Sequence, residues 1–184
     1  MDLVESLQLL AEQNISGVAF LLAYGATWLV CGVLWQRVAM RVAAYATLFQ
    51  GLVALPVALG VSFLIGAVGS ERPVADEITQ LSVLIGMSQV LGLPLLIYLV
   101  VKRQFVVMPF VFAVITAMHF VLYSWLYQTP IYIAMAMLIS VGTMITMLTA
   151  PDSTPRAGPA RVSFLTGGVL AATGLLFVML HAAT

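Results

Sequence analysis

His119 is an ionisable side chain set deep in a long apolar run, residues 106–127, that contains no Asp, Glu, Lys or Arg. On a helix, Thr116 and Tyr123 share its face, because they lie three residues before it and four residues after it. A polar side chain in hydrocarbon is costly, so this stripe should face neighbouring helices or a wet cavity. Because an imidazole gains and loses a proton near neutral pH, the stripe offers a solute site whose charge can switch.

Other polar side chains are expected at the same depth as His119. At a rise of 1.5 Å per residue, His119 lies about 12 Å from the carboxyl end of its run, and polar residues of other runs lie about 13–15 Å from that same side. Gln89 is on the adjoining antiparallel run, so we expect Gln89 and His119 to pair. The candidate residues for lining a pore or binding a solute are His119, Gln89, Tyr123, Thr116, Tyr24 and Ser140.

Two interpretations of this polar layer stay open. In the first, the layer is a network of interhelical hydrogen bonds that fixes the packing of the helices. In the second, it lines a water-accessible passage or a small-solute site.

The elements that must position these residues are membrane-spanning helices. Of the 184 residues, 62% are hydrophobic and only 8% are charged, which is far too little charge to cover a water-soluble surface. A helix needs about 20 mostly apolar residues to span a bilayer. Six runs meet that length, and together they predict one all-α domain over residues 1–184, an integral membrane bundle of six transmembrane helices. The runs are residues 15–35, 43–68, 80–101, 106–127, 130–149 and 162–181.

The basic residues predict the orientation of this bundle. The first, third and fifth connections hold six of the seven basic residues, and the opposite side holds only Arg72. Basic connections stay in the cytoplasm, so both termini are expected outside, in a bacterial cytoplasmic (inner) membrane. The six are Arg37, Arg41, Lys102, Arg103, Arg156 and Arg161.

The first fourteen residues carry apolar side chains at helical spacing: Leu3, Leu7, Leu10 and Ala11. This pattern is typical of a short amphipathic helix lying on the outer surface of the membrane. A frayed polar tail is the alternative.

Small residues recur at every fourth position on several of the runs, as in Ala54, Ala58 and Ser62. Such stripes indicate close helix contacts within the bundle or a subunit interface, so a homo-oligomer surrounded by membrane lipid is expected. Three prolines, Pro56, Pro94 and Pro109, fall inside the runs and are expected to kink them.

Several kinds of chemistry are excluded by what the sequence lacks. Zero net charge gives no broad basic face for nucleic acid. Cys31 is the only cysteine, so the chain forms no internal disulfide and no thiolate metal cluster. Neither a phosphate-binding loop nor a zinc-binding His-Glu-x-x-His motif occurs. Ser88 and Ser140 can approach His119, but nothing marks either as an activated nucleophile. We therefore expect no metal, no cofactor and no catalytic residue.

The run Met-Pro-Phe-Val-Phe-Ala-Val-Ile-Thr-Ala-Met-His-Phe-Val-Leu-Tyr-Ser-Trp-Leu-Tyr (108–127), followed by Gln-Thr-Pro-Ile-Tyr (128–132), resembles an uncharacterised family of small bacterial multi-spanning membrane proteins. Within it, His119-Phe120, Tyr123 and Trp125-Leu126-Tyr127 match best. Gln89 with Pro94, and Gly17 with Trp28, lie at similar positions of that family. The acidic amino-terminal tail departs from the family's pattern. The resemblance implies an integral membrane protein and draws attention to His119, but it brings no substrate.

The sequence thus favours a small channel or permease with a polar mid-membrane layer around His119. The alternative is a membrane scaffold or accessory subunit that transports nothing. A continuous wet path to His119 and Gln89 would favour transport, whereas a dry centre with an exposed groove of small residues would favour the scaffold.

Overall fold

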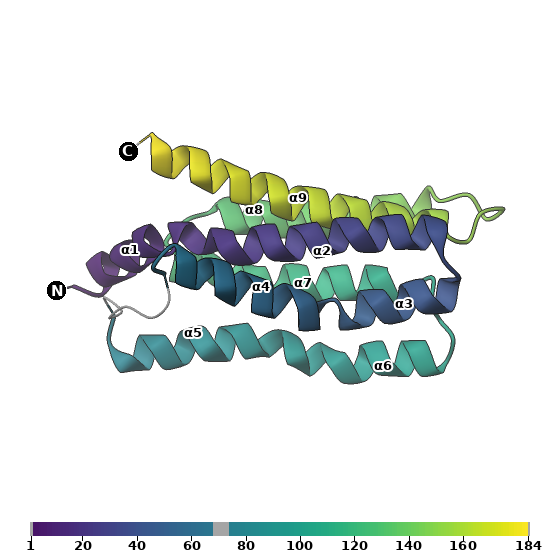
Figure 1. Cartoon of the computed structure of the whole chain (residues 1–184), viewed down its shortest axis with the longest axis horizontal. Helices are drawn as coiled ribbons and strands as arrows, with labels where there is room; N and C mark the ends of the chain where they lie inside the picture. Colours follow the sequence, from purple (N-terminus) through teal and green to yellow (C-terminus); the bar gives the residue numbers. More distant parts are fainter. Residues whose placement is uncertain (1, 68–73, 184) are drawn as a thin grey trace.

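Six long helices run side by side in this computed structural model, which describes residues 2–67 and 74–183 (Figure 1). Each is long and apolar enough to cross a membrane. The predicted all-α bundle of six spans is confirmed, and the chain is a multi-pass membrane protein. The spans are Ile15–Arg37, Met40–Leu64, Ile78–Val101, Met108–Leu126, Ile131–Leu148 and Ala157–Ala182.

Three of the spans are single helices and three are composite. The single helices are α7 (Met108–Leu126), α8 (Ile131–Leu148) and α9 (Ala157–Ala182). The first span joins the 3₁₀ turn η1 (Ile15–Gly17) to α2 (Val18–Arg37), and the second joins α3 (Met40–Phe49) to α4 (Gly51–Leu64). The third span consists of α5 (Asp76–Ser88), the 3₁₀ turn η2 (Gln89–Gly92) and α6 (Leu93–Val101).

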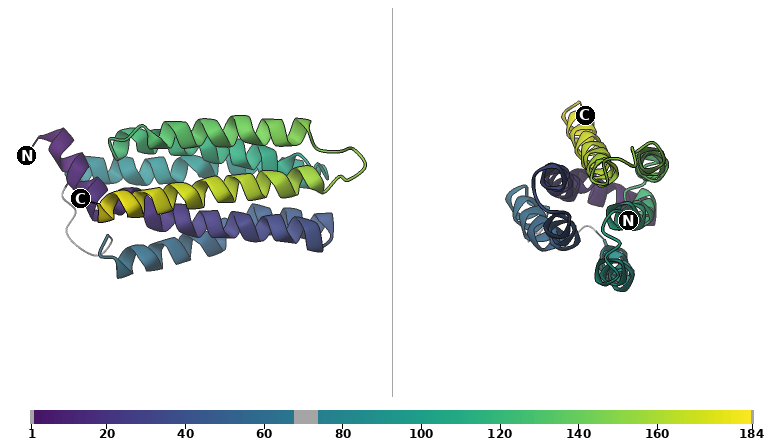
Figure 2. Two further views of the ribbon diagram at one scale, coloured as in Figure 1. Left: turned by 90° about the horizontal axis from the view of Figure 1, so that it is seen from above. Right: turned by 90° about the vertical axis from the view of Figure 1, so that its right-hand side faces the viewer.

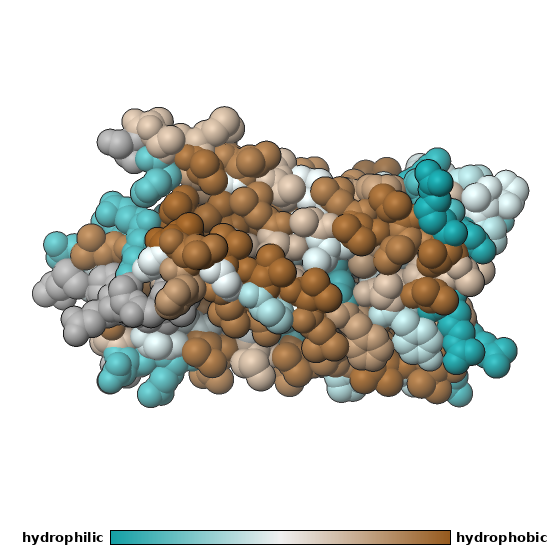
Figure 3. Space-filling model, viewed as in Figure 1, coloured by the Kyte–Doolittle hydropathy of each residue, from teal (hydrophilic) through white to brown (hydrophobic). Residues whose placement is uncertain are grey.

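Both chain termini lie at the same end of the bundle, as an even number of crossings requires (Figures 1 and 2). We call this the terminal end. The opposite end, where α2 and α6 finish and α9 begins, carries the six basic residues named above, and we call it the basic end. An apolar surface separates the two hydrophilic ends (Figure 3). The predicted connection at 69–79 includes Glu71, Arg72 and Pro73, which lie outside the described residues.

The helices α2 and α9 form the closest contact in the bundle. Gly25 and Gly167 let the two backbones meet, because a Cβ on Gly167 would lie 2.7 Å from the Gly25 carbonyl oxygen and 2.8 Å from the Leu29 nitrogen. Nearer the basic end, the Phe164 ring fills the space left by Gly32. Close backbone approach of this kind is the main source of helix association in lipid, where apolar burial contributes little.

The three prolines act differently from one another. Pro94 lies in the first turn of α6, directly after the 3₁₀ turn η2. Proline lacks the N–H that would bond to the carbonyl four residues earlier, so the helix tightens there. Pro56 lies within α4, which continues past it. The expected kink at Pro109 is wrong, because α7 begins at Met108 and proline is tolerated in the first turn of a helix.

The predicted amino-terminal helix is present as α1 (Leu3–Gln13). Asp2 and Glu5 form a capping box that satisfies its first backbone N–H groups. Leu7 and Leu10 are buried on this helix, where they pack against Leu126 at the terminal end of α7. Helix α1 therefore covers part of the bundle through Leu7 and Leu10, while Leu3 stays exposed.

The link between α1 and α2 is unusual, because Ile15, Ser16 and Gly17 all have positive φ angles. A left-handed backbone is costly for a β-branched residue such as Ile15. The Tyr132 hydroxyl of α8 fastens this link by donating a hydrogen bond of 2.6 Å to the Ser16 carbonyl. Gly17 lies against the Tyr127 and Tyr132 rings, where a side chain would collide with both.

Candidate functional site

Two polar pairs join the interrupted third span to α7. The Nδ1 atom of His119 lies 3.0 Å from the Ser88 hydroxyl, and the Gln89 side-chain amide donates to the Thr116 hydroxyl at 3.1 Å. His119 and Thr116 are buried, with 8% and 1% of their surfaces exposed, while Ser88 and Gln89 are half-buried. We call these four residues the polar cluster. Ser88 and Gln89 lie where α5 ends and η2 begins, and His119 and Thr116 face them from α7.

The hydrogen bonds of the Ser88 hydroxyl indicate which ring nitrogen of His119 carries the proton. The Ser88 hydroxyl lies 2.7 Å from the Ile85 carbonyl, which can only accept. A serine hydroxyl has one proton, so Ser88 donates to Ile85 and accepts from the imidazole. The neutral tautomer that satisfies both bonds carries its proton on Nδ1. An imidazole that donates to Ser88 cannot also remove a proton from it, so this pair is not arranged as a nucleophile and its base.

The expected pairing of Gln89 with His119 is wrong by one residue. Ser88 occupies the position next to His119, and Gln89 reaches Thr116 one turn earlier on α7. Counting residues gives depth along a helix but assumes a regular α-helical rotation. The 3₁₀ turn starts at Gln89 and has three residues per turn, so the directions of the side chains change there.

Tyr123 extends the polar cluster toward the terminal end through an aromatic cluster. The His119 ring meets the Phe120 and Tyr123 rings edge-on, with centroids 5.4 and 5.1 Å apart. Tyr123 in turn contacts Tyr127 and Tyr132, at 5.7 and 5.8 Å. Its hydroxyl faces the third span, 3.9 Å from where a Cβ on Gly86 would lie. Tyr123 thus stays with His119, as its place on the same helix face predicts.

Tyr24, on α2, lies next to the second span and close enough to Tyr123 for the two side chains to interact electrostatically. It is half-buried, and its hydroxyl is 3.8 Å from where a Cβ on Gly51 would lie. The two tyrosines therefore face different interrupted spans: Tyr24 faces the start of α4, and Tyr123 faces α5.

Ser140 is not drawn into the polar cluster. It is half-buried on α8, and in the described part of the chain no hydrogen bond connects it to His119. Thr173, a polar residue of α9, donates to the Val169 carbonyl of its own helix. The predicted layer thus separates into a connected group on the third and fourth spans and individual side chains elsewhere.

Gln50 is a polar residue that the depth argument does not select. It lies at the junction of α3 and α4, with 5% of its surface exposed, and its amide nitrogen has no hydrogen-bond partner among the described residues. The Gln50 amide oxygen is 3.9 Å from the Cys31 sulfur. The signal that could have found Gln50 is a lone amide within an otherwise apolar run, directly before Gly51.

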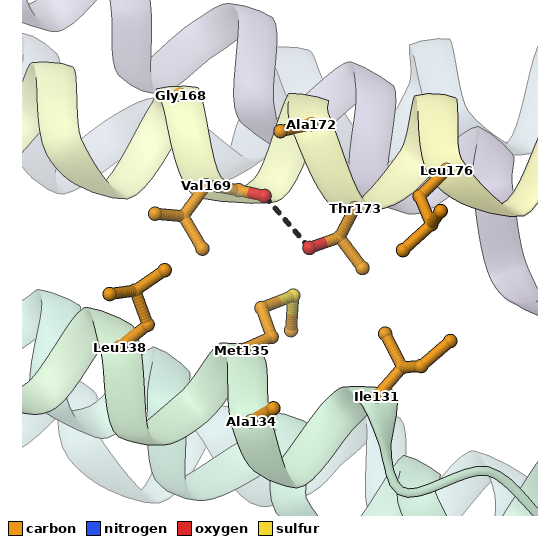
Figure 4. A pocket seen from close by; sticks show the side chains of 9 residues that line it. All are labelled: Ile131, Ala134, Met135, Leu138, Gly168, Val169, Ala172, Thr173 and Leu176. Atoms are coloured by element: carbon orange, nitrogen blue, oxygen red, sulfur yellow. Dashed lines mark hydrogen bonds between the residues drawn. The ribbon is translucent and has the colours of Figure 1, made fainter.

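Two hollows lie away from the polar cluster, and none of the six candidate residues lines either. One, of about 350 Å³, opens between α8 and α9. Figure 4 shows Met135 and Leu138 facing Val169 and Leu176 across it, with the Thr173 hydroxyl already bonded within its own helix. The other, of about 330 Å³, lies at the basic end.

Among the described residues, no three His, Cys, Asp or Glu side chains come together in a way that could hold a metal ion. Cys31 is buried, which suits a small packing residue.

A comparison with protein families identifies what the chain is related to. A family of unknown function, DUF7010, matches residues 4–180. The chain belongs to DUF7010. The match runs from α1 to the last turns of α9 and so includes all six spans. The resemblance to an uncharacterised family is therefore confirmed. Among curated proteins and solved structures, nothing matches the chain.

Proposed function

We propose that this DUF7010 protein is a small permease or channel for uncharged, hydrogen-bonding solutes. The groups that would contact such a solute are the Ser88 hydroxyl, the Gln89 amide and the His119 imidazole. These are neutral donors and acceptors, and no carboxylate lies within the described membrane spans to compensate a cation. Transport of a small polar molecule fits this chemistry better than ion coupling does.

The observation that carries the proposal is a local irregularity near the middle of two neighbouring spans, each beside an amide side chain. Gln50 and Gln89 themselves keep right-handed helical backbone angles. Gln50 lies ten residues from the start of its span, about 15 Å, and Gln89 lies twelve residues from the end of its span, about 18 Å. Interrupted helices near mid-membrane are typical of solute sites in transporters, because they free backbone and side-chain polar groups for the solute.

The two interrupted spans also separate toward the terminal end. Near the basic end, α3 contacts α6. Beyond the interruptions, α4 packs on α2 while α5 packs on α7, and the two helices lie apart (Figures 1 and 2). A small rotation of α5 about η2 would widen the access to Ser88 and Gln89. Neither hollow reaches the polar cluster, so by the criterion given above this structure alone favours the scaffold. The permease requires that such a motion open a wet path to His119 and Gln89.

A flux measurement tests the proposal. Purified protein is reconstituted into liposomes, and the entry of glycerol and urea is followed by stopped-flow light scattering. We expect faster entry of at least one probe than in protein-free liposomes, and a return to the protein-free rate in His119→Ala and Gln89→Leu. Thr146→Val is the control, because Thr146 is half-buried and bonds only within α8. The proposal fails if neither probe enters faster, or if His119→Ala changes only thermal stability.

The basic end is proposed to face the cytoplasm of a bacterial cell, with both termini outside. The charge difference between the ends supports this orientation. Single cysteines at positions 39 and 154 should react with an impermeant reagent only from the cytoplasmic side, and a cysteine at position 74 only from outside. The opposite labelling would reverse the orientation.

A membrane scaffold that associates with other helices is the second candidate. The hollow between α8 and α9 supports it, since Ala134, Gly168 and Ala172 line it, and a Cβ on Gly168 would meet nothing within 4 Å. A helix of a second copy would fit such a groove of small residues. If Gly168→Leu dissociates an oligomer in detergent while flux is absent, the scaffold is favoured over the permease.

A further inference from the structure

A hollow at the basic end combines positive charge with an apolar wall. It lies between the end of α2 and the beginning of α9 and has a volume of about 330 Å³. Arg156 and Arg161 line it together with Gln36, and Ala160 and Phe164 form its apolar side.

The positive charge of this hollow is poorly compensated. Six basic residues lie at the basic end, against one acidic residue, Asp152. Arg161 is held in place by donating to the Thr149 carbonyl at 3.3 Å, an uncharged acceptor. Arg156 directly precedes the first turn of α9, a helix of 26 residues whose amino-terminal end adds partial positive charge.

The polar groups of the hollow match a phosphate group. Guanidinium groups bind phosphate oxygens in pairs of parallel hydrogen bonds, and two arginines line this hollow. The Gln36 amide adds an uncharged donor to the same hollow.

The apolar wall distinguishes a lipid from a free anion. Ala160 and Phe164 lie on α9 just inside the start of its span, where the acyl chains of a lipid begin. A free phosphate ion would gain nothing from this wall, whereas a phospholipid would place its headgroup at the arginines and its glycerol and first methylenes against the wall. Basic pockets between spanning helices are suited to anionic headgroups.

We propose that this hollow binds the headgroup phosphate of an anionic phospholipid. Arg156 and Arg161 hold the phosphate, Gln36 orients it, and Phe164 packs beside the start of an acyl chain. This inference does not depend on the proposed transport activity.

Native mass spectrometry of the delipidated full-length protein in detergent tests the site. The probes are phosphatidylglycerol, zwitterionic phosphatidylcholine and inorganic phosphate, each titrated separately. We expect saturable binding of phosphatidylglycerol that is at least tenfold tighter than that of phosphatidylcholine or inorganic phosphate. Arg156→Gln and Arg161→Gln should each weaken phosphatidylglycerol binding about fivefold.

The matched control is Arg41→Gln, which removes the same charge at the same end from a residue that stacks over Tyr45. It should leave phosphatidylglycerol binding within twofold of the original. Because Arg161 also bonds to the Thr149 carbonyl, Arg156→Gln is the decisive variant if Arg161→Gln fails to fold. The proposal is overturned if Arg156→Gln binds phosphatidylglycerol as the original does, if all three arginine variants weaken it equally, or if inorganic phosphate binds as tightly as the lipid.

Discussion

The first and sixth spans differ sharply from the third in how they are held. Half of the residues in the 18-residue apolar stretch of the first span are buried. In the corresponding stretch of the third span, 17% are buried. At the α2–α9 crossing, glycines bring backbone against backbone. The third span is joined to α7 by two side-chain hydrogen bonds and by packing of the η2 turn, where Gly92 lies against Ile115.

This difference gives the two regions different mechanical properties: the α2–α9 pair is rigid, and the third span can bend. A close glycine contact has one good geometry, so α2 and α9 form a fixed frame. A span with few buried side chains and a 3₁₀ turn in its middle can bend at little cost. The polar cluster lies on the flexible side of this division, which is where a transport site needs to be.

The largest effect is expected from filling the α2–α9 contact. A leucine at Gly167 would force the two helices apart, because the atoms it meets at 2.7 and 2.8 Å belong to the backbone of α2. We expect Gly167→Leu to lower the free energy of unfolding by about 3 kcal/mol or to prevent folding. The measurement is thermal unfolding in detergent followed by tryptophan fluorescence. Gly60→Leu is the control, since a Cβ at Gly60 would meet nothing within 4 Å and the change should matter little.

The second largest effect is expected at the hydrogen bond that joins α3, the first half of the second span, to α2. The indole N–H of Trp35 donates to the Thr47 hydroxyl at 3.0 Å, which fastens α3 to α2 in the buried interior. Trp35→Phe should lower the free energy of unfolding by about 1–2 kcal/mol, because the bond is lost and a gap remains. Thr47→Val and the double variant complete a thermodynamic cycle. Strict additivity of the two single changes would show that the bond contributes nothing.

A smaller effect is expected at the link between α1 and α2. Tyr132→Phe removes the hydrogen bond to the Ser16 carbonyl and should cost about 1 kcal/mol. Limited proteolysis should then cut between α1 and α2 faster than in the original, while the bundle itself stays resistant. Tyr98→Phe is the control, because Tyr98 is exposed on α6. Equal cleavage rates for both variants would contradict the role given to Tyr132.

The smallest stability change is expected in the polar cluster itself. Ser88→Ala removes the bond to His119, and hydrogen bonds between membrane helices are worth about 0.6 kcal/mol on average. We expect a small loss of thermal stability together with a clear change in solute flux. Ser82→Ala, on the same helix, should leave flux unchanged because its hydroxyl bonds only to the Ile78 carbonyl. A large loss of thermal stability without a change in flux would show that the polar cluster holds the helices together and does not bind a solute.

The sequence predicts the spans well and the contacts between them poorly. Span length follows from bilayer thickness and hydropathy, so all six runs are found, although the sixth starts at Ala157 because Pro159 is tolerated in a first turn. Tyr123 and Thr116 follow from helical spacing on a single helix. The partner of His119 does not, because it depends on the rotation of another helix, and Pro94 with η2 changes that rotation.

The junction at Gln50 shows the same limit. Its run is apolar on both sides, and hydropathy alone reads it as one continuous span. The irregularity at Gln50 is local, because Gln50 itself keeps right-handed helical backbone angles, and hydropathy does not detect it. The capping box of α1 is also local, but the apolar spacing there was enough to predict the helix.

The division between a fixed frame and a movable third span is tested most directly by distances between spin labels in liposomes. Cysteines replace Gly60 on α4 and Leu84 on α5 in one protein, and Ala26 on α2 and Leu175 on α9 in another, both in a Cys31→Ala background. Double electron–electron resonance should give a broad or two-peaked distribution for the α4–α5 pair and a single narrow peak for the α2–α9 pair. Equally narrow peaks for both pairs would contradict the account.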